Sequence, residues 1–342
     1  MILMTNNFAK YLSDYLSIYL PGVIKVSNHT INSYRDTFKL LLKFAQSKNL
    51  KIEKITLEKI TKNFILEFLE WIEKERNCSI STRNQRLAAI KSFFKYVQAE
   101  SPENLYEIRR ILNIRKKKCA KPLVAYLTSD ELKIIFNAPD LSKKSGRRDL
   151  TLLVLLYDSG ARVNEIINVA IKDVRLNSPG VITLYGKGNK IRQVPLMKKT
   201  CKLIEKYIEE YKKTNLVVKR EMPLFFNQKK KPLSRWGVNY IINKYVVKLK
   251  EEGKLHIDFK ITPHVFRHSK AMHLLQANIN LIYIRDFLGH TNISTTEIYA
   301  RADIETKRKA LENVYQDLVP GDIPMWDEDA DLMDWLNKLG RS

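Results

Sequence analysis

Apolar residues recur at helical spacing in four successive stretches of the N-terminal sequence, and this periodicity restricts that part of the chain to a helical fold. Each stretch has one apolar face to bury, and four such helices can close a small bundle. We therefore expect a four-helix domain over residues 1–105. The apolar positions are Phe8, Tyr11, Leu12, Tyr15 and Tyr19 in the first stretch, Ile31, Tyr34, Phe38, Leu41, Leu42 and Ala45 in the second, Phe64, Phe68, Leu69 and Ile72 in the third, and Leu87, Ile90, Phe94 and Val97 in the fourth.

Positive charge is the second constraint. The 342 residues include 60 Lys and Arg but 37 Asp and Glu, a formal net charge of +23 that suits a polyanionic partner. Nucleic acid is the leading candidate, although charge alone also fits a ribosomal protein or a protein bound to a membrane surface. In the fourth helical stretch, basic residues that fall off the apolar face suggest a helix that enters a major groove, with an ordinary solvated face as the alternative. These residues are Arg83, Arg86, Lys91 and Lys95.

A basic segment follows the predicted bundle. From Arg109 to Lys121 the sequence RRILNIRKKKCAK holds seven basic residues and no acidic one. We expect residues 106–125 to form an interdomain linker that lies along phosphates, and a flexible tether without a fixed contact is the alternative. The residues expected to touch phosphates are Arg115, Lys116, Lys117 and Lys118.

Cysteine spacing and hydropathy argue against several other classes of protein. Cys78, Cys119 and Cys201 lack the paired spacing found in zinc sites and disulfide frameworks, which favours a reducing compartment and no metal. No stretch reaches the ~20 apolar residues that a membrane helix needs, and the first residues lack the pattern of a signal peptide. We expect a cytoplasmic protein that is neither secreted nor membrane-spanning.

A second domain, mainly helical with a small antiparallel sheet, is predicted over residues 126–318. Thr128 and Glu131 have the spacing of a capping box, and LTLLVLLYDSGAR indicates a buried helix that ends near Gly160. In GVITLYGKGNKIRQVPL, apolar residues alternate on both sides of GKGNK, which predicts a hairpin with a glycine-rich turn.

The segment ITPHVFRHS combines a helix start with chemically active side chains. Pro263 suits the first helical position, and His264, Arg267 and His268 then share one face of the helix. A guanidinium beside two imidazoles can bind a phosphate and move a proton. On its own the segment also fits an ordinary helix start with polar residues at the surface.

Five motifs in order, SGARVNEI, GKGNK, HVFRH, FLGH and TTEIY, resemble those of the tyrosine recombinases, the family of the phage integrases and Xer recombinases. NHTINSYRDTFKLLLKFA and ISTRNQRLAAIKSFFKYV are similar to the core-binding domain of that family. The resemblance implies a mainly α fold, in which a four-helix SAM-like domain precedes a mixed α/β, mostly helical catalytic domain. It also implies a catalytic set at Arg162, Lys187, His264, Arg267, His290 and Tyr299.

The resemblance assigns these residues roles in phosphoryl transfer. Tyr299 would be the nucleophile that forms a covalent 3′-phosphotyrosine, with His264 as its base and Lys187 as the acid that protonates the leaving 5′ oxygen. The two arginines and His290 would stabilise the charge of the transition state, so the scheme needs no metal or other cofactor. Two residues are expected to support this set without contacting DNA: Glu165, by orienting Arg162, and His268.

The implied function is site-specific recombination by an Xer-like or transposon-borne enzyme that performs integration, excision or resolution as a homotetramer on two duplex DNA sites. A type IB topoisomerase, which relaxes DNA as a monomer, and a non-catalytic DNA-binding accessory protein are the alternatives. An acidic tail over residues 319–342 has apolar residues at helical spacing. We expect this tail to dock on a neighbouring subunit, with folding back on its own catalytic domain as the alternative. Its apolar stripe comprises Leu332, Trp335, Leu336 and Leu339.

Overall fold

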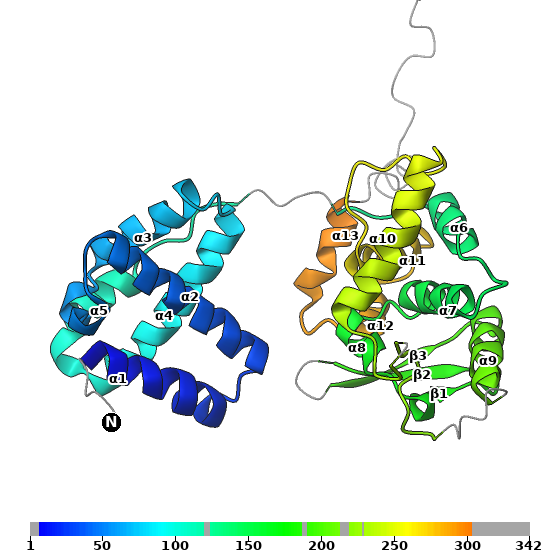
Figure 1. Ribbon diagram of the computed structural model, residues 1–342, viewed down its shortest axis with the longest axis horizontal. Helices are drawn as coiled ribbons and strands as arrows, with labels where there is room; N and C mark the ends of the chain where they lie inside the picture. The colour runs from blue at the N-terminus through cyan, green and yellow to red at the C-terminus, as the bar shows by residue number, and fades with distance from the viewer. Residues whose placement is uncertain (1–6, 120–123, 187–189, 213–218, 228, 303–342) are drawn as a thin grey trace, which may run out of the picture. The chain divides into compact units, whose positions relative to one another are not determined.

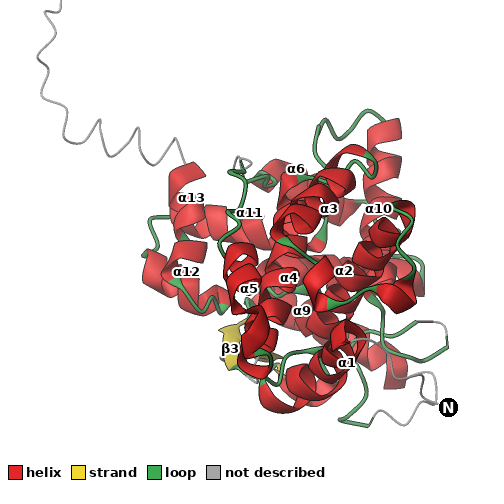
Figure 2. Cartoon of the chain, turned by 90° about the vertical axis from the view of Figure 1, so that its left-hand side faces the viewer, coloured by secondary structure: helices red, strands yellow, loops and turns green. Residues whose placement is uncertain are grey.

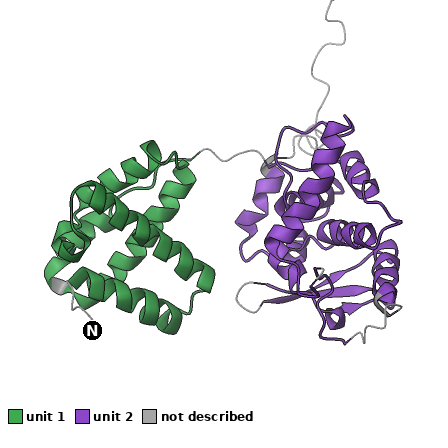
Figure 3. Cartoon of the chain, in the orientation of Figure 1, with its two compact units in different colours: residues 1–122 green, residues 123–342 purple. Residues whose placement is uncertain are grey.

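The chain divides into two compact units, residues 1–122 and 123–342 (Figure 3). The computed structural model describes residues 7–119, 124–186, 190–212, 219–227 and 229–302. Each unit has an apolar core of its own. Within the described ranges, none of the helices combines the length and the apolar character that crossing a membrane requires.

The first unit is helical, and the four predicted helices are confirmed (Figure 1). Ser27, Thr61 and Ser79 cap α2, α3 and α4, because each hydroxyl accepts a hydrogen bond from the backbone N–H three residues further on. The predicted apolar faces form the core of the unit. The elements are α1 (Asn7–Asp14), the π-helix η1 (Tyr15–Val23), α2 (Asn28–Ser47), the short 3₁₀ turns η2 (Ile52–Lys54) and η3 (Leu57–Lys59), α3 (Lys62–Lys74), α4 (Ile80–Glu100), η4 (Pro102–Asn104) and α5 (Leu105–Leu112).

Helix α5 corrects the predicted start of the linker. The linker was expected to begin at residue 106, but Ile108, Ile111 and Ile114 are buried in the core of the first unit. Ile108 and Ile111 lie on one side of α5 and Ile114 follows the helix, and burial of these side chains outweighs the basic character of the segment. Beyond the helix, the backbone of Lys117 exchanges two hydrogen bonds with the side chain of Asn84 on α4, at 2.9 and 3.1 Å. The predicted tether is therefore held against α4 at this point.

The second unit combines helices with a small sheet. The predicted capping box is present at the start of α6, where Thr128 and Glu131 bond to each other's backbone N–H groups. Pro263 begins α11, as predicted. The elements are α6 (Ser129–Asn137), α7 (Lys144–Asp158), α8 (Val163–Ile167), η5 (Ile171–Asp173), β1 (Val174–Arg175), β2 (Val181–Tyr185), β3 (Ile191–Pro195), α9 (Lys198–Lys212), α10 (Arg235–Glu251), α11 (Pro263–Gln276), α12 (Leu281–Leu288), η6 (Ile293–Thr295) and α13 (Glu297–Ala302).

The three described strands form an antiparallel sheet in the order β1-β2-β3. The predicted hairpin is confirmed, with Ile182 opposite Val194 and both side chains buried. At the turn end of the hairpin the Gly186 N–H donates to the Lys190 carbonyl at 2.7 Å. Strand β1 was not predicted, because two residues are too short for alternation to be recognised.

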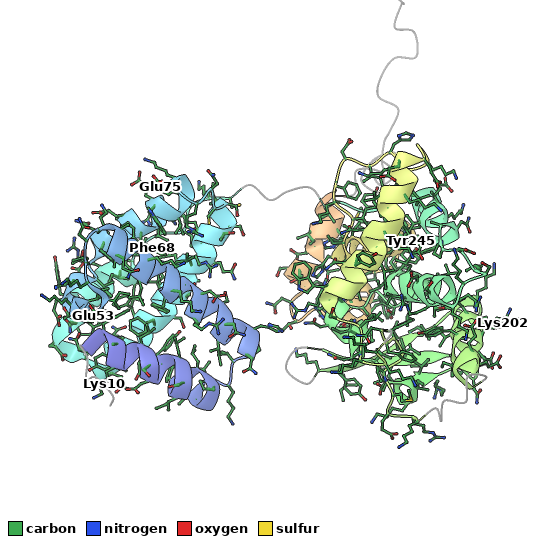
Figure 4. The ribbon with its side chains drawn as sticks, viewed as in Figure 1. Lys10, Glu53, Phe68, Glu75, Lys202 and Tyr245 are labelled. Carbon is green, nitrogen blue, oxygen red and sulfur yellow. The ribbon has the colours of Figure 1, made fainter. Side chains whose placement is uncertain are left out.

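Helix α11 packs against α7, α12 and α13, and Figure 2 shows α13 beside α11. The hydroxyl of Tyr245 on α10, a residue labelled in Figure 4, donates to the buried Asp149 carboxylate on α7 at 2.8 Å. Two left-handed glycines turn the chain beside α11: Gly160, with φ +56°, follows α7, and Gly289, with φ +65°, ends α12. A Cβ at Gly160 would lie 2.9 Å from Leu288, so these two turns are close together.

Candidate active site

The buried guanidinium of Arg267 lies where the two glycine turns meet. Arg267 is 2% exposed on α11, and it donates from Nη1 to the Gly160 carbonyl at 2.7 Å and from Nη2 to the Leu288 carbonyl at 2.6 Å. These bonds use one N–H of each terminal nitrogen. Burial and then the charges of Arg162 and Arg192 lower the pKa of Arg267 to about 9, so the guanidinium stays charged at neutral pH.

A single buried carboxylate, Glu165, joins two further arginines. Its Oε1 accepts from Arg162 Nη1 and Arg192 Nη1 at 2.9 Å each, and its Oε2 accepts from Arg192 Nη2 and the Arg162 backbone N–H at 2.8 Å each. Burial alone would raise the pKa of Glu165, but the hydrogen bonds and charges of Arg192 and Arg162 hold it below its usual range. The expected contact between Glu165 and Arg162 is therefore present. The partly exposed Arg162 side chain also donates to the Gly289 carbonyl at 3.3 Å.

The hydroxyl of Tyr299 lies 2.9 Å from Nδ1 of His268. Tyr299 stands on α13 and is 1% exposed, so its hydroxyl must be uncovered before it can reach a phosphorus atom. Burial raises the pKa of this phenol, and the positive charges of Arg267 and Arg162 offset part of that rise. His268 was expected only to support the site, whereas the structure places it in direct contact with the predicted nucleophile.

Two more histidines complete the group. His290 Nδ1 lies 2.9 Å from the Thr296 hydroxyl, and its ring is nearly parallel to that of Tyr299, with 6.4 Å between centroids. Burial, followed by Arg267 and Arg162, lowers the pKa of His290 to about 3. His264 is exposed and stacks on His268 at 6.2 Å between centroids. Partial desolvation of its ring and the same two arginines lower its pKa as well, so both imidazoles are neutral at pH 7.

The charges of the site are unbalanced. Among the described residues, Arg162 and Arg192 pair with the Glu165 carboxylate while Arg267 binds two carbonyls, and all three guanidiniums lower the pKa of His290. Such a cluster favours an anion, and planar guanidinium groups suit a phosphate in particular. The arrangement can therefore hold a phosphodiester beside a tyrosine hydroxyl.

Sequence reasoning missed Arg192, which belongs to this cluster. Arg192 on β3 also donates from Nε to the Phe287 carbonyl at 3.0 Å, and Gly289 packs on its guanidinium so closely that a Cβ would come within 3.0 Å. Arg192 is the second residue of IRQVPL, the second strand of the predicted hairpin, where the sequence showed only an alternating strand pattern. What sets Arg192 apart is its partial burial on a strand, and burial cannot be read from a single sequence.

Some predicted residues lie outside the described ranges. Lys187 belongs to the turn between β2 and β3, and the acidic tail with Leu332, Trp335, Leu336 and Leu339 follows residue 302. The remaining predicted members of the active site are brought together on α8, α11, α13 and the turn after α12.

Two predicted DNA contacts on α4 are engaged within the first unit. Arg83 was expected on an exposed basic face, but it is 5% exposed and its Nε lies 2.7 Å from Glu73 on α3. The prediction was wrong for Arg83, because the ion pair allows a charged side chain to be buried between two helices. Arg86 is partly buried and donates to the Ser33 carbonyl and the Thr37 hydroxyl, at 3.0 Å each.

The other predicted contacts form a basic patch on the first unit. Burial, followed by the charges of Lys116 and Lys95, lowers the pKa of Lys91. Helix α4 and the segment after α5 therefore bring these ammonium groups near one another. Arg115 and Lys118 are exposed beside them in the sequence. Lys117 differs, because its Nζ lies 2.7 Å from the Glu73 carboxylate.

Comparisons with known proteins identify the family of the chain. The phage integrase family matches residues 125–306, and the phage integrase N-terminal SAM-like domain matches residues 13–101. A putative integrase/recombinase, y4rC, of Sinorhizobium fredii is 34% identical over 321 residues, covering 92% of this chain and 93% of that protein. Tyrosine recombinase XerC of Staphylococcus epidermidis is 30% identical over 290 residues, covering 84% of this chain and 92% of that protein.

A solved structure shares the fold. The XerH site-specific recombinase, in a post-cleavage complex with palindromic difH substrate, superposes with a TM-score of 0.65 at 24% identity, over 83% of this chain and 78% of that one. The family match spans more than half of the chain, and the curated relatives span most of it. The chain therefore belongs to the phage integrase family, as a tyrosine recombinase that cleaves and rejoins DNA.

Proposed function

We propose that this enzyme is a site-specific recombinase that cleaves DNA by attack of Tyr299 and holds the strand as a covalent 3′-phosphotyrosine. The observation that carries the proposal is the excess of guanidinium charge beside the Tyr299 hydroxyl. A phosphodiester gains negative charge as its phosphorus becomes five-coordinate, and preorganised cationic donors stabilise that charge. The bond energy is kept in the ester to tyrosine, so rejoining needs no nucleotide.

Arg162 and Arg267 are the proposed donors to the phosphate oxygens, with His290 beside them. Arg162 is suited to this contact because its side chain is 35% exposed while Glu165 fixes its orientation. Arg267 is fixed by two carbonyls, so its direction is set before DNA arrives. Lys187, on the glycine-flanked turn of the hairpin, is the proposed acid that protonates the leaving 5′ oxygen.

Recombination between two sites is favoured over relaxation of supercoiled DNA. Relatives that cover most of this chain carry the names integrase/recombinase and tyrosine recombinase. Exchange of strands between two duplexes needs four active sites, so we propose a homotetramer assembled on two DNA sites, with the acidic tail as a contact between neighbouring subunits. A type IB topoisomerase would act as a monomer.

The products distinguish these activities. The DNA site is first selected from random duplexes by its binding to the purified enzyme, and two copies are placed on one supercoiled plasmid. A recombinase should delete or invert the segment between the copies, and it should leave a plasmid without the site unchanged. Relaxation of both plasmids, without a recombinant product, would instead indicate a topoisomerase.

A further inference from the structure

The hydroxyl of Tyr299, the predicted nucleophile, is within hydrogen-bond distance of His268. His268 Nδ1 lies 2.9 Å from the hydroxyl, and the two rings meet edge to face at 5.6 Å between centroids. In the neutral tautomer that carries its hydrogen on Nε2, Nδ1 accepts the hydrogen bond of the hydroxyl. Both residues stand on helices that pack together, α11 and α13.

The other histidines of the site are placed differently. His290 uses Nδ1 for the Thr296 hydroxyl, and its ring faces the Tyr299 ring rather than the hydroxyl. His264, the base expected from the family resemblance, stacks on His268 one helical turn earlier. Among the described residues, His268 is the hydrogen-bond partner of the Tyr299 hydroxyl.

We propose that His268, rather than His264, is the base that takes the proton of Tyr299 during cleavage. The inference rests on the proposed function. The O–H bond of Tyr299 breaks as an N–H bond forms at Nδ1, and the phenolic oxygen bonds to phosphorus. The bond from phosphorus to the 5′ oxygen breaks, and that oxygen receives a proton from the general acid. Rejoining reverses these steps, and His268 returns the proton to Tyr299.

The charges around His268 link this proton transfer to DNA binding. Among the described residues, the titratable groups that face it are His264 and Arg267 of α11, His290 of the turn after α12 and Tyr299 of α13. Burial, then His264 and Arg267, lower the pKa of His268 to about 4, so the imidazole is neutral and ready to accept a proton. An imidazolium beside Arg267 is unfavourable until an anionic phosphate balances the charge. The tyrosine therefore keeps its proton until the scissile phosphate is bound.

The substitution His268→Asn separates a base from a positioning residue. The Asn side chain can place Oδ1 where Nδ1 stands and accept the same hydrogen bond, but it cannot carry the proton. The matched control is His273→Asn, because His273 on the same helix pairs its Nδ1 with the Tyr157 hydroxyl at the same distance of 2.9 Å, outside the active site. The rate of covalent adduct formation is measured in a single turnover on a nicked duplex that traps the adduct.

We expect His268→Asn to slow adduct formation by about 100-fold or more and His273→Asn to leave the rate within about 3-fold of wild type. A fluorinated tyrosine in place of Tyr299, whose phenol is more acidic, should restore the His268→Asn variant much more than it changes the wild type. DNA binding equal to that of the wild type shows that the variant is folded, and His268→Gln replaces it if it is not.

Near-normal adduct formation by His268→Asn would overturn the assignment, as would a defect that the more acidic phenol leaves unchanged. Either result, with a normal adduct in the wild type, leaves the proposed function intact. Absence of any adduct from the wild type would overturn both.

Discussion

At the scale of single residues, Glu165 holds the site together from below the surface. It is 4% exposed and receives hydrogen bonds from two guanidiniums and a backbone N–H. Without this carboxylate, Arg162 and Arg192 would repel each other and lose their common orientation. Its role is therefore to set the direction of Arg162, which has the exposure to meet a phosphate.

The substitution Glu165→Gln keeps the shape of the side chain and removes its charge. Breaking a buried ion pair in this way should lower the free energy of unfolding by about 3 kcal/mol. Because the pKa of Glu165 is lower in the folded state, its stabilisation is present above the ordinary value of 4.5 and is lost as the pH falls through the lower, folded value.

Chemical denaturation at several pH values tests this prediction. The difference between wild type and Glu165→Gln should be constant from pH 7 down to about 4.5 and should shrink below it. A difference that grows in acid would contradict the assigned ion pairs.

The sequence predicted the roles of some residues of the site and of the first unit, but not of others. Arg162, Arg267 and Tyr299 lie in short motifs whose order marks them, and the structure brings them together. Arg192 and Arg83 do not lie in such motifs. Both are arginines whose carboxylate partners come from other elements, Glu165 and Glu73, and a pairing across the fold leaves no pattern in one sequence.

At the scale of elements, strand β3 and the end of α12 are joined through Arg192. Its guanidinium spans from Glu165 on α8 to the Phe287 carbonyl on α12. Gly289 follows directly, and it combines a left-handed backbone with close contact to the same guanidinium. The hairpin that carries Lys187 is thus tied to the turn that carries His290.

The pair Gly289→Ala and Gly253→Ala tests this connection. Both glycines have a positive φ, near +65°, so each alanine should cost about 1–2 kcal/mol of stability from backbone strain. At Gly253 the added Cβ meets nothing within 4 Å, whereas at Gly289 it must displace Arg192. We expect adduct formation to fall by about 10-fold or more in Gly289→Ala alone, because a displaced supporting residue costs activity. Equal rates in the two variants would show that the position of Arg192 does not matter to cleavage.

Elements with long or strongly alternating apolar patterns were predicted correctly. The buried run of α7 and the hairpin of β2 and β3 are examples. Helix α5 was missed because its basic residues suggested a linker, although Ile108 and Ile111 bury its other side. Its packing in the core of the first unit is a tertiary effect, whereas the local composition alone indicated a linker.

At the scale of the whole molecule, the net charge of +23 and the basic patch on the first unit describe a protein that neutralises phosphates. Each phosphate contact on duplex DNA contributes about 0.9 to the slope of log affinity against log salt concentration. In the first unit, Lys91, Lys95 and Lys116 lie near enough to one another to form a patch of this charge.

Two neighbouring lysines make a matched pair for this account. Lys116→Ala should reduce the salt slope by about 0.9, because its ammonium is available to a phosphate. Lys117→Ala should reduce it less, since Lys117 already pairs with Glu73 at 2.7 Å. Binding titrations at several salt concentrations give both slopes, and the reverse order would place the DNA elsewhere on this unit.

The central claim is that Tyr299 becomes covalently joined to DNA, and mass spectrometry of the trapped complex tests it most directly. The enzyme is incubated with a nicked duplex that carries its selected site, the adduct is digested, and the modified peptide is sequenced. We predict a nucleotide attached through its 3′-phosphate to Tyr299, and none in Tyr299→Phe, which should bind the duplex with unchanged affinity because only the hydroxyl is lost. An adduct on another residue, or one formed by Tyr299→Phe, would contradict the account.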